Sequence, residues 1–303
     1  MDKKKANLLA KLALLIVAIL WGSSLTVVKQ SSKTFNPNFI LAIRFTLAAI
    51  LLSIIFWKRL RQAKYDDIKN GLLIGIFLFM AYSSQTLGVK FADPGRSGFL
   101  SASYCVIVPF LGWIVFKQRP DRYNLSAAAL CITGIFFISL SGSSSHVDNP
   151  LAWLGDLLAL LSGLLFASHI IAVSALARDR DPIVMTILQF IMAAVLSWIT
   201  TIVVEDNSNL VVTSRSVMEL LYLAVMCTAV ALLLQNIGQK YTNPSTAAII
   251  LGFESIFGIL IPVLIGIESL TVFSVIGFVF IFAAILVSET KLSFLKKDTI
   301  TAQ

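Results

Sequence analysis

The stretch Leu87–Gly95 (LGVKFADPG) returns later in the chain as Ile237–Ser245 (IGQKYTNPS), offset by 150 residues. A second stretch behaves in the same way, because Arg44–Leu51 (RFTLAAIL) returns as Gln189–Leu196 (QFIMAAVL), offset by 145 residues. The chain is therefore interpreted as two copies of one unit, residues 1–145 and 146–303. Each copy holds about five long apolar segments, and an odd number of membrane crossings turns the second copy upside down.

The composition places these segments in a membrane. The chain is 57% hydrophobic and 13% charged, with a mean hydropathy of +0.88, whereas soluble proteins carry about 25% charged residues. The apolar runs are long enough to cross about 30 Å of hydrocarbon as helices. We therefore expect an all-α integral membrane protein with ten transmembrane helices in two inverted five-helix repeats. The expected helices cover residues 8–28, 37–57, 71–91, 97–116, 124–141, 154–177, 183–204, 217–239, 245–266 and 270–290.

The formal charge of +8 could indicate nucleic-acid binding, but its distribution indicates membrane orientation instead. If the N-terminus is cytoplasmic, 18 Lys and Arg residues fall on the cytoplasmic side, the last of them Lys291, Lys296 and Lys297, and 5 fall outside. Cytoplasmic loops of membrane proteins carry this excess. The sequence thus predicts a multi-pass protein of the cell membrane with both termini in the cytoplasm, the lipid bilayer as partner and no nucleic acid.

Several motifs of enzymes and energy-coupled pumps do not occur in the sequence. There is no GxxxxGK[ST] for ATP, no HExxH for zinc and no GxSxG around a nucleophilic serine. The three cysteines lie inside apolar runs without metal-ligand spacing. We therefore expect no cofactor, no metal and no enzyme activity. Gly71 and Gly75 form one GxxxG pair, which indicates helix packing and leaves a homodimer possible.

Five stretches of the chain together resemble a known family. They are Trp21-Gly22-Ser23-Ser24, Arg44-Phe45, Ser97–Pro120, Gly155-Asp156-Leu157-Leu158 and Leu251–Thr271. In motif order and helix count the chain resembles the drug/metabolite transporter superfamily, specifically its EamA-type ten-helix members. The resemblance implies alternating-access transport, usually efflux of metabolites, amino acids or drugs. Where the family has a Glu-Pro pair, Glu254 is followed by Ser255 and the next proline is Pro262, so the expected kink in this helix is displaced.

Two charged residues lie deep inside apolar segments, where a charge costs roughly 2.5–3.5 kcal/mol on insertion scales. Arg44 lies about 10 Å from the outer end of its expected helix, and Glu254 about 13 Å from the cytoplasmic end of its own. In the functional interpretation, Arg44 binds a carboxylate or phosphate of the substrate and the desolvated Glu254 accepts a proton in coupled transport. In the alternative, the two residues form an ion pair that only holds helices together.

Other polar residues of the apolar segments are weaker candidates for the substrate or coupling site. His169 lies near the middle of its helix and can titrate near neutral pH, although a buried, hydrogen-bonded structural histidine is the favoured interpretation. Gln85 corresponds to Gln235 in the repeat, and Tyr104 corresponds to Glu254. Polar groups at matching places suit a site where the repeats meet, but Gln and Tyr also hydrogen bond between helices in ordinary packing.

Four aromatic residues could line an apolar cavity for an aromatic or amphipathic substrate. They are Trp21, Phe45, Tyr82 and Phe166. Aromatic residues at helical spacing more often serve as packing or as interface anchors. Together these features favour a secondary active transporter of small organic solutes, with export as the expected direction. An uptake carrier of the same fold and a membrane-embedded enzyme acting on lipids are the alternatives.

Overall fold

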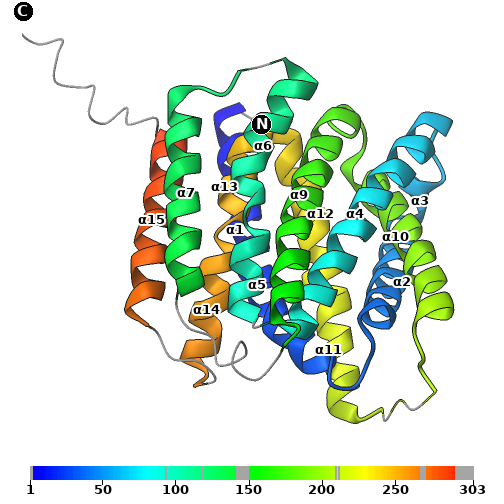
Figure 1. The fold of residues 1–303 in the computed structure, drawn as a ribbon. Helices are drawn as coiled ribbons and strands as arrows, with labels where there is room; N and C mark the ends of the chain where they lie inside the picture. Colours follow the sequence, from blue (N-terminus) through cyan, green and yellow to red (C-terminus); the bar gives the residue numbers. More distant parts are fainter. Residues whose placement is uncertain are drawn as a thin grey trace, which may run out of the picture.

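The structure is a computed structural model, and it describes residues 3–92, 94–117, 119–140, 150–208, 210, 212–266 and 271–290 (Figure 1). Within these ranges the chain is helical and contains no strand. The helices are α1 (Lys3–Ser31), α2 (Pro37–Ile55), α3 (Trp57–Leu60), α4 (Tyr65–Phe91), α5 (Pro94–Ser101), α6 (Tyr104–Phe116), α7 (Arg122–Leu140), α9 (Ala152–Leu176), α10 (Pro182–Val204), α11 (Ser214–Ala224), η1 (Val225–Val230), α12 (Ala231–Tyr241), α13 (Pro244–Leu251), α14 (Glu254–Leu264) and α15 (Val272–Thr290).

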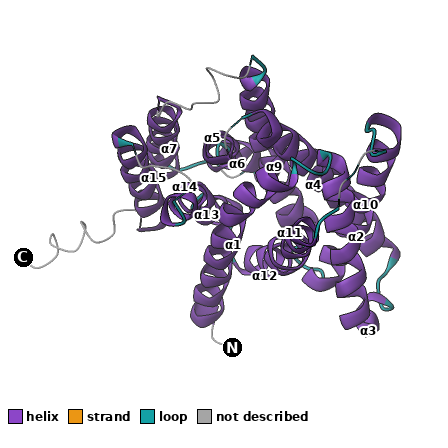
Figure 2. Ribbon diagram, turned by 90° about the horizontal axis from the view of Figure 1, so that it is seen from below, coloured by secondary structure: helices purple, strands orange, loops and turns teal. Residues whose placement is uncertain are grey.

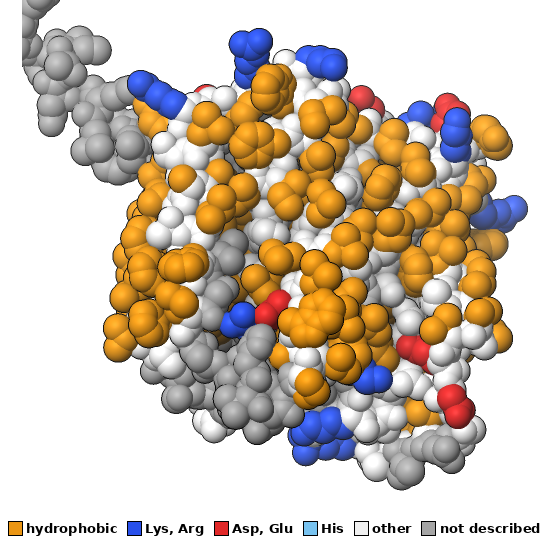
Figure 3. All heavy atoms as spheres, viewed as in Figure 1, with side chains coloured by type: hydrophobic (Ala, Val, Ile, Leu, Met, Phe, Trp, Pro, Cys, Tyr) orange, Lys and Arg blue, Asp and Glu red, His pale blue; other side chains and the backbone are white. Residues whose placement is uncertain are grey.

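The described residues contain 8 helices that are long and apolar enough to cross a membrane. α7 and α15 are helical where the fifth and tenth expected segments lie, and their crossing of the membrane stays a prediction. Figure 3 shows the surface that such helices present, with hydrophobic side chains over the middle of the molecule and most charged side chains toward its two ends. Apolar residues turned outward in a continuous band are expected where the surrounding solvent is lipid.

Proline marks the beginning of several helices, as the turn signals of the sequence indicate. α2, α10 and α13 each begin at a proline, where the missing N–H is no loss and the fixed backbone angle suits the first turn. Asp181 and Asn243 precede two of these prolines, and their side chains accept hydrogen bonds from the backbone of Ile183 and Thr246. Asp93, which precedes Pro94, lies outside the described residues.

Two expected helices are each interrupted a few residues after they begin, and the two interruptions lie at matching places in the two halves of the chain. α5 ends at Ser101 and α6 begins at Tyr104, while α13 ends at Leu251 and α14 begins at Glu254. At both breaks the backbone makes hydrogen bonds to the third preceding residue, such as Cys105 N to Ala102 O at 3.0 Å and Ser255 N to Gly252 O at 3.2 Å. The turn at 252–253 tightens without a proline, and Pro262 lies further along in α14, where the displaced kink stays a prediction.

Packing between the two halves also follows a matching pattern. α4 packs along α9, and the corresponding α12 packs along α1. α5 and α6 contact α9, as α13 and α14 contact α1, while α2 packs on α10 and α7 on α15. The end-on view in Figure 2 shows α7 and α15 side by side at one edge of the bundle and α2 and α10 together at the other. The core lies where α1, α2, α4, α6, α9, α10, α12 and α13 meet.

α1 begins, and α15 ends, at the upper end of the bundle in Figure 1. This arrangement fits two termini on one side of a membrane. The segments 56–64, which contains α3, 119–121 and 177–181 lie at the same end, and they hold many of the cations on which the orientation was predicted. Lys291, Lys296 and Lys297 lie outside the described residues, as do Gln303 and the boundary between residues 145 and 146.

The GxxxG pair, Gly71 and Gly75, lies at an interface between two helices of the same chain. A Cβ added at Gly71 would lie 2.4 Å from Leu188 Cβ, and one at Gly75 would lie 2.6 Å from Met192 Cβ and 2.7 Å from Gln189 O. Both glycines therefore let α4 approach α10 closely, as small residues do at membrane helix interfaces. The motif gives no support to a homodimer.

Gly75→Ala is expected to lower the free energy of unfolding by about 1–3 kcal/mol, because the new methyl group meets backbone atoms that cannot move aside easily. Gly112→Ala is the matched control, since a Cβ there meets only side-chain atoms at 3.6 Å and 3.9 Å. Thermal unfolding of both variants in detergent measures the difference. Equal melting temperatures for Gly75→Ala and the wild type would contradict this packing.

Candidate functional site

Arg44 on α2 is a buried cation with an incomplete set of partners. Its side chain is 1% exposed, and its Nε donates to Thr228 Oγ1 at 3.0 Å. The guanidinium carbon lies 5.1 Å from the centroid of the Tyr82 ring, within the range of a cation–π contact. Its Nη2 has no hydrogen-bond partner among the described residues. A buried charge without a counter-charge is costly in an apolar environment, so a group that approaches Nη2 would be bound favourably.

The π-helical segment η1 provides the hydrogen-bonding groups opposite Arg44. In a π-helical turn the backbone bonds reach one residue further than in an α-helix, and such turns occur frequently at functional sites. Thr228 Oγ1 donates to Leu223 O at 2.8 Å and accepts from Arg44. Trp21 Nε1 on α1 donates to Cys227 O at 3.1 Å. Thus η1 is tied to both α1 and α2 through side chains that the sequence marked as candidates.

An aromatic cluster, formed by Trp21, Phe45, Tyr82, Tyr104, Phe166 and Phe190, lies next to Arg44. Its centre is Tyr82, whose ring centroid lies 5.5 Å from that of Phe45, 5.2 Å from that of Phe166 and 6.4 Å from that of Trp21. Tyr104 joins the cluster through Phe166, at 6.3 Å between centroids. All of these side chains are buried. The four aromatic residues considered as a cavity lining therefore do meet, and here they pack against one another, as aromatic residues at helical spacing more often do.

Glu254 is the first residue of α14 and is 3% exposed. Its Oε1 has no hydrogen-bond partner within the described part of the chain. The carboxylate is within electrostatic range of Tyr82 and Tyr104. Gly22 on α1 allows its approach, because a Cβ at Gly22 would lie 2.8 Å from Glu254 O and 2.5 Å from Phe257 Cβ. The carboxyl group is thus placed beside the aromatic cluster.

Arg44 and Glu254 do not form the ion pair that the sequence left open. No nitrogen of Arg44 lies within 4.0 Å of a Glu254 oxygen, and among the described side chains Thr228 and Tyr82 are the partners of the guanidinium. Arg44 contacts the Tyr82 ring from α2, whereas Glu254 lies at the beginning of α14, with its backbone against Gly22 of α1. The interpretation as a mutual structural pair is therefore wrong, and each group keeps at least one unpartnered polar atom.

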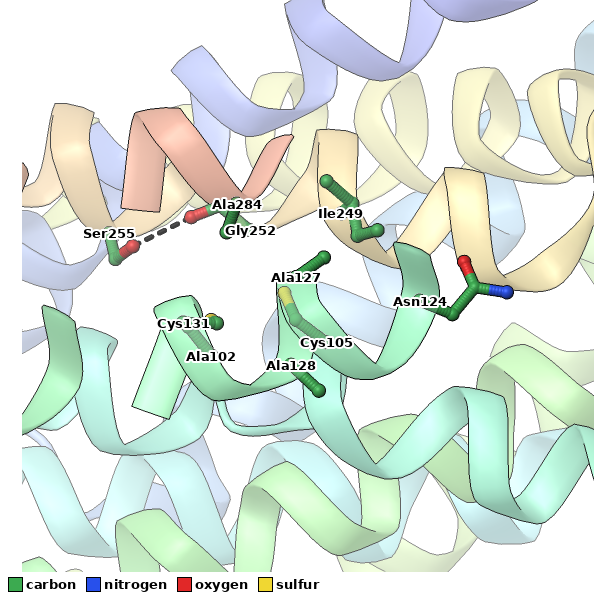
Figure 4. A pocket seen from close by; sticks show the side chains of 10 residues that line it. All are labelled: Ala102, Cys105, Asn124, Ala127, Ala128, Cys131, Ile249, Gly252, Ser255 and Ala284. Carbon is green, nitrogen blue, oxygen red and sulfur yellow. Dashed lines mark hydrogen bonds between the residues drawn. The ribbon is translucent and has the colours of Figure 1, made fainter. Parts of the chain in front are cut away.

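A small cavity separates the two interrupted helices (Figure 4). Its volume is about 10 Å³, which is room for about one water molecule. Ala102 and Cys105 line it from the break between α5 and α6, and Gly252 and Ser255 line it at the matching places of the second repeat. Cys105 Sγ donates to Ala248 O at 3.2 Å across this space. The other lining residues are Asn124, Ala127, Ala128, Cys131, Ile249 and Ala284.

Three predicted site residues stand apart from the aromatic cluster. His169 Nε2 lies 2.8 Å from Gln189 Oε1 between α9 and α10, as in a structural histidine. Gln85 Nε2 donates to Ser101 Oγ at 3.2 Å, which anchors α4 to the end of α5. Gln235 on α12 is buried, and its Oε1 has no partner among the described groups. The structure therefore gathers Trp21, Arg44, Tyr82, Tyr104 and Glu254. The side chains of His169, Gln85 and Gln235 make their contacts elsewhere.

Sequence reasoning missed three contributors. Thr228 and Cys227 act through η1, and no local pattern in the sequence signals a π-helical turn. Gln189 corresponds to Arg44 in the repeat and could have been singled out on that ground. It holds His169, and its own Nε2 has no partner in the described structure.

The EamA-like transporter family matches the chain twice, over residues 8–140 and 153–290. The chain belongs to the EamA-like transporter family. The two matches cover most of the sequence, and each falls within one of the two expected copies. This EamA-like protein is accordingly a multi-pass membrane transporter.

Relatives of this EamA-like protein carry the same description. An uncharacterized transporter of Archaeoglobus fulgidus is 33% identical over 287 residues, covering 93% of this chain and 86% of the relative. The uncharacterized transporter YrdR of Bacillus subtilis is 21% identical, covering 95% of this chain and 93% of the relative. A solved crystal structure matches with a TM-score of 0.74 at 17% identity, covering 95% and 98% of the two chains, which shows a shared fold.

Polar contacts join helices at the lower end of the EamA-like bundle in Figure 1, one of them between the two halves and one within the first half. Arg96 at the beginning of α5 forms a two-pronged ion pair with Asp156 on α9, with both N–O distances 2.9 Å. Lys29 at the end of α1 donates to Val89 O at 2.9 Å and to Ala92 O at 2.8 Å, at the end of α4. A bidentate pair of this kind holds its two helices in a defined geometry.

Proposed function

We propose that this protein is a secondary active carrier of small organic solutes that works by alternating access and exports its substrate. The observation that carries this proposal is the pair of buried charges, Arg44 and Glu254, which face one aromatic cluster without neutralising each other. Ionisable residues inside a membrane are costly and commonly mark a transport pathway. The proposed direction of transport rests on the family resemblance, and a flux assay distinguishes export from uptake.

The chemistry of the cluster suits a solute with an anionic group and an apolar body. Arg44 can donate from its unpartnered Nη2 to a carboxylate or phosphate, and such charge-assisted bonds are the stronger kind. Trp21, Tyr82 and Phe166 provide rings against which an apolar part can pack. Glu254 is the group proposed to exchange a proton during coupling. Because the rings now fill the space between them, substrate entry requires the helices to separate.

Alternating access is supported by the internal repetition. The proposed architecture has ten crossings in two inverted repeats, residues 1–145 and 146–303, and an inverted repeat lets the protein exchange one outward-open and one inward-open arrangement of similar packing. The broken helices α5/α6 and α13/α14 fit the discontinuous helices of such carriers. The contacts at the lower end, above all Arg96–Asp156, keep that end closed in this conformation.

Asp156→Asn is expected to favour the conformation that is open at the lower end, because it removes the charge that pairs with Arg96. The readout is labelling of a cysteine placed at the buried Ser97, in a variant whose three native cysteines are replaced by alanine. We expect labelling by a membrane-impermeant thiol reagent to rise about threefold or more, since a partly buried pair contributes on the order of 1 kcal/mol. Restoration by the exchange Arg96→Asp with Asp156→Arg is the control; unchanged labelling in Asp156→Asn would contradict the gate.

Both termini are proposed to lie in the cytoplasm, on the basis of the 18-to-5 distribution of Lys and Arg. A reporter that is active only outside the cytoplasm, fused after Gln303, is expected to stay inactive. The same reporter inserted into the connection between α1 and α2 is expected to be active. Strong activity of the C-terminal fusion would reverse this orientation.

The experiment that tests the carrier is solute counterflow in liposomes. A thermal-shift screen of the purified protein against organic anions, amino acids and amphipathic drugs selects ligands, and each hit is then tested for exchange across the liposome membrane without ATP. A carrier concentrates labelled solute against an excess of the unlabelled solute inside. If no hit is exchanged and the protein chemically converts added lipid, the protein is a membrane enzyme and not a carrier. Export is separated from uptake by how the net flux depends on the side of loading and on a proton gradient.

A further inference from the structure

A cleft of about 640 Å³ opens at the upper end of the bundle, and none of its lining residues belongs to the aromatic cluster. It lies between the beginning of α1, the turn from α12 to α13 and the connection from α9 to α10. Volumes of about 300–1,000 Å³ are typical of sites for small ligands. Asn7 on α1 closes one wall, since its Nδ2 donates to Tyr241 O at 2.9 Å.

The cleft is lined by two cations, Arg178 and Lys240, that have no ion-pair partner in the described part of the chain. Neighbouring cations differ, because Arg180 and Arg59 are neutralised. Their acidic partners are Asp66, Asp67 and Asp181. Lys240 Nζ donates to Arg180 O at 3.0 Å, which positions the ammonium group and leaves two of its three N–H donors for other groups. Arg178 and Lys240 thus bring two positive charges without an ion-pair partner together in the cleft.

A third donor is already buried in the same cleft. Thr242 is 9% exposed, and its Oγ1 has no hydrogen-bond partner among the described residues. Thr242 lies between Lys240 and Asn243, and Asn243 accepts from Thr246 N at 2.7 Å, so the turn that carries these groups is held in place. A buried hydroxyl without a partner is unusual, because such groups are nearly always satisfied by protein or by a bound molecule.

We propose that this cleft is an anion-binding site, distinct from the aromatic cluster, that takes a phosphate or carboxylate group through Arg178, Lys240 and Thr242. A guanidinium, an ammonium and a hydroxyl group form a donor set that matches the oxygens of such an anion. The anion can belong to the headgroup of an acidic lipid, because the cleft lies at the end of the membrane-spanning helices, or to a soluble organic or inorganic anion. The site does not depend on the transported solute, and its test involves no transport.

The test measures binding to the purified full-length protein in detergent by native mass spectrometry. The probes are a phosphatidylglycerol, a phosphatidylcholine with the same acyl chains, and inorganic phosphate. The cleft variant is Arg178→Gln with Lys240→Gln, and Thr242→Val removes only the hydroxyl group. The matched control is Lys58→Gln with Lys69→Gln, which removes the same charge from exposed positions at the same end of the bundle but outside the cleft.

We expect the wild type to bind phosphatidylglycerol in preference to phosphatidylcholine, or to bind inorganic phosphate, and the cleft variant to lose about tenfold or more in affinity. Thr242→Val should lose about threefold, and the control pair should bind as the wild type does. If inorganic phosphate does not displace bound phosphatidylglycerol, the ligand of the site is a lipid headgroup. If inorganic phosphate does displace it, the ligand is a free anion. Equal losses in the cleft and control variants, or no binding of either anionic probe, would overturn the site and leave these cations as orientation signals only.

Discussion

Replacing Glu254 with Gln is expected to lower the rate of solute transport about tenfold or more while the protein remains folded. The amide has nearly the same size and keeps the packing of α14 against Gly22, so the structural cost is small. It cannot carry a charge or exchange a proton, and hydrogen bonds to charged groups contribute about 1.5–3 kcal/mol, which corresponds to a tenfold effect or more. Wild-type transport should respond to a pH gradient, and transport by the variant should not.

The control for this experiment is Asp179→Asn, which neutralises an exposed carboxylate in the connection between α9 and α10. It should leave the flux, the pH response and the melting temperature unchanged. Exchange of substrate without net flux is compatible with loss of coupling in Glu254→Gln. A variant with wild-type flux and wild-type pH response would remove Glu254 from the mechanism.

Arg44→Met is expected to have opposite effects on transport and on stability. The variant removes a buried cation that has no counter-charge among the described residues, and replacing an uncompensated buried charge by an apolar side chain is often neutral or stabilising. Thr228 keeps its bond to Leu223 O, so no new polar group loses its only partner. The melting temperature should therefore stay the same or rise, while transport of anionic solutes falls about tenfold or more.

Thermal unfolding and counterflow on the same preparation measure the two effects of Arg44→Met. Arg44→Lys should recover part of the transport of anionic solutes, because it keeps the charge but loses the planar contact with Tyr82. Lys33→Met, which removes an exposed cation, should change neither quantity. A marked loss of stability in Arg44→Met would show that the guanidinium holds the helices together and would count against its role as a free donor to substrate.

The double variant Arg44→Met with Glu254→Gln tests the separation of the two charges. Groups that do not interact have additive effects, within about 0.3–0.5 kcal/mol. We therefore expect the stability changes of the single variants to add, without recovery in the double variant. Recovery by 1 kcal/mol or more would indicate the ion pair that the structure does not contain.

The sequence alone was sufficient for the helical membrane class, the repeated pattern and the burial of Arg44 and Glu254. These properties depend on local hydropathy and on comparing one stretch with another, and no knowledge of contacts is needed for them. Membership of the EamA family, inferred from five stretches of sequence, is confirmed by the matches over both halves. The roles of the site residues, the ten crossings and the inversion stay predictions.

Only the tertiary structure decided which groups meet. Hydropathy could not separate an Arg44–Glu254 pair from the observed contacts of Arg44 with Thr228 and Tyr82, because that choice depends on how α2, α4 and η1 pack. The sequence also could not predict three backbone changes, namely the matching breaks at 102–103 and 252–253 and the π-helical turn at 225–230. No proline or glycine pattern common to them marks these positions. Apolar content specifies that a helix is buried or lies in lipid, whereas the partner of each polar atom depends on the packing of helices far apart in the chain.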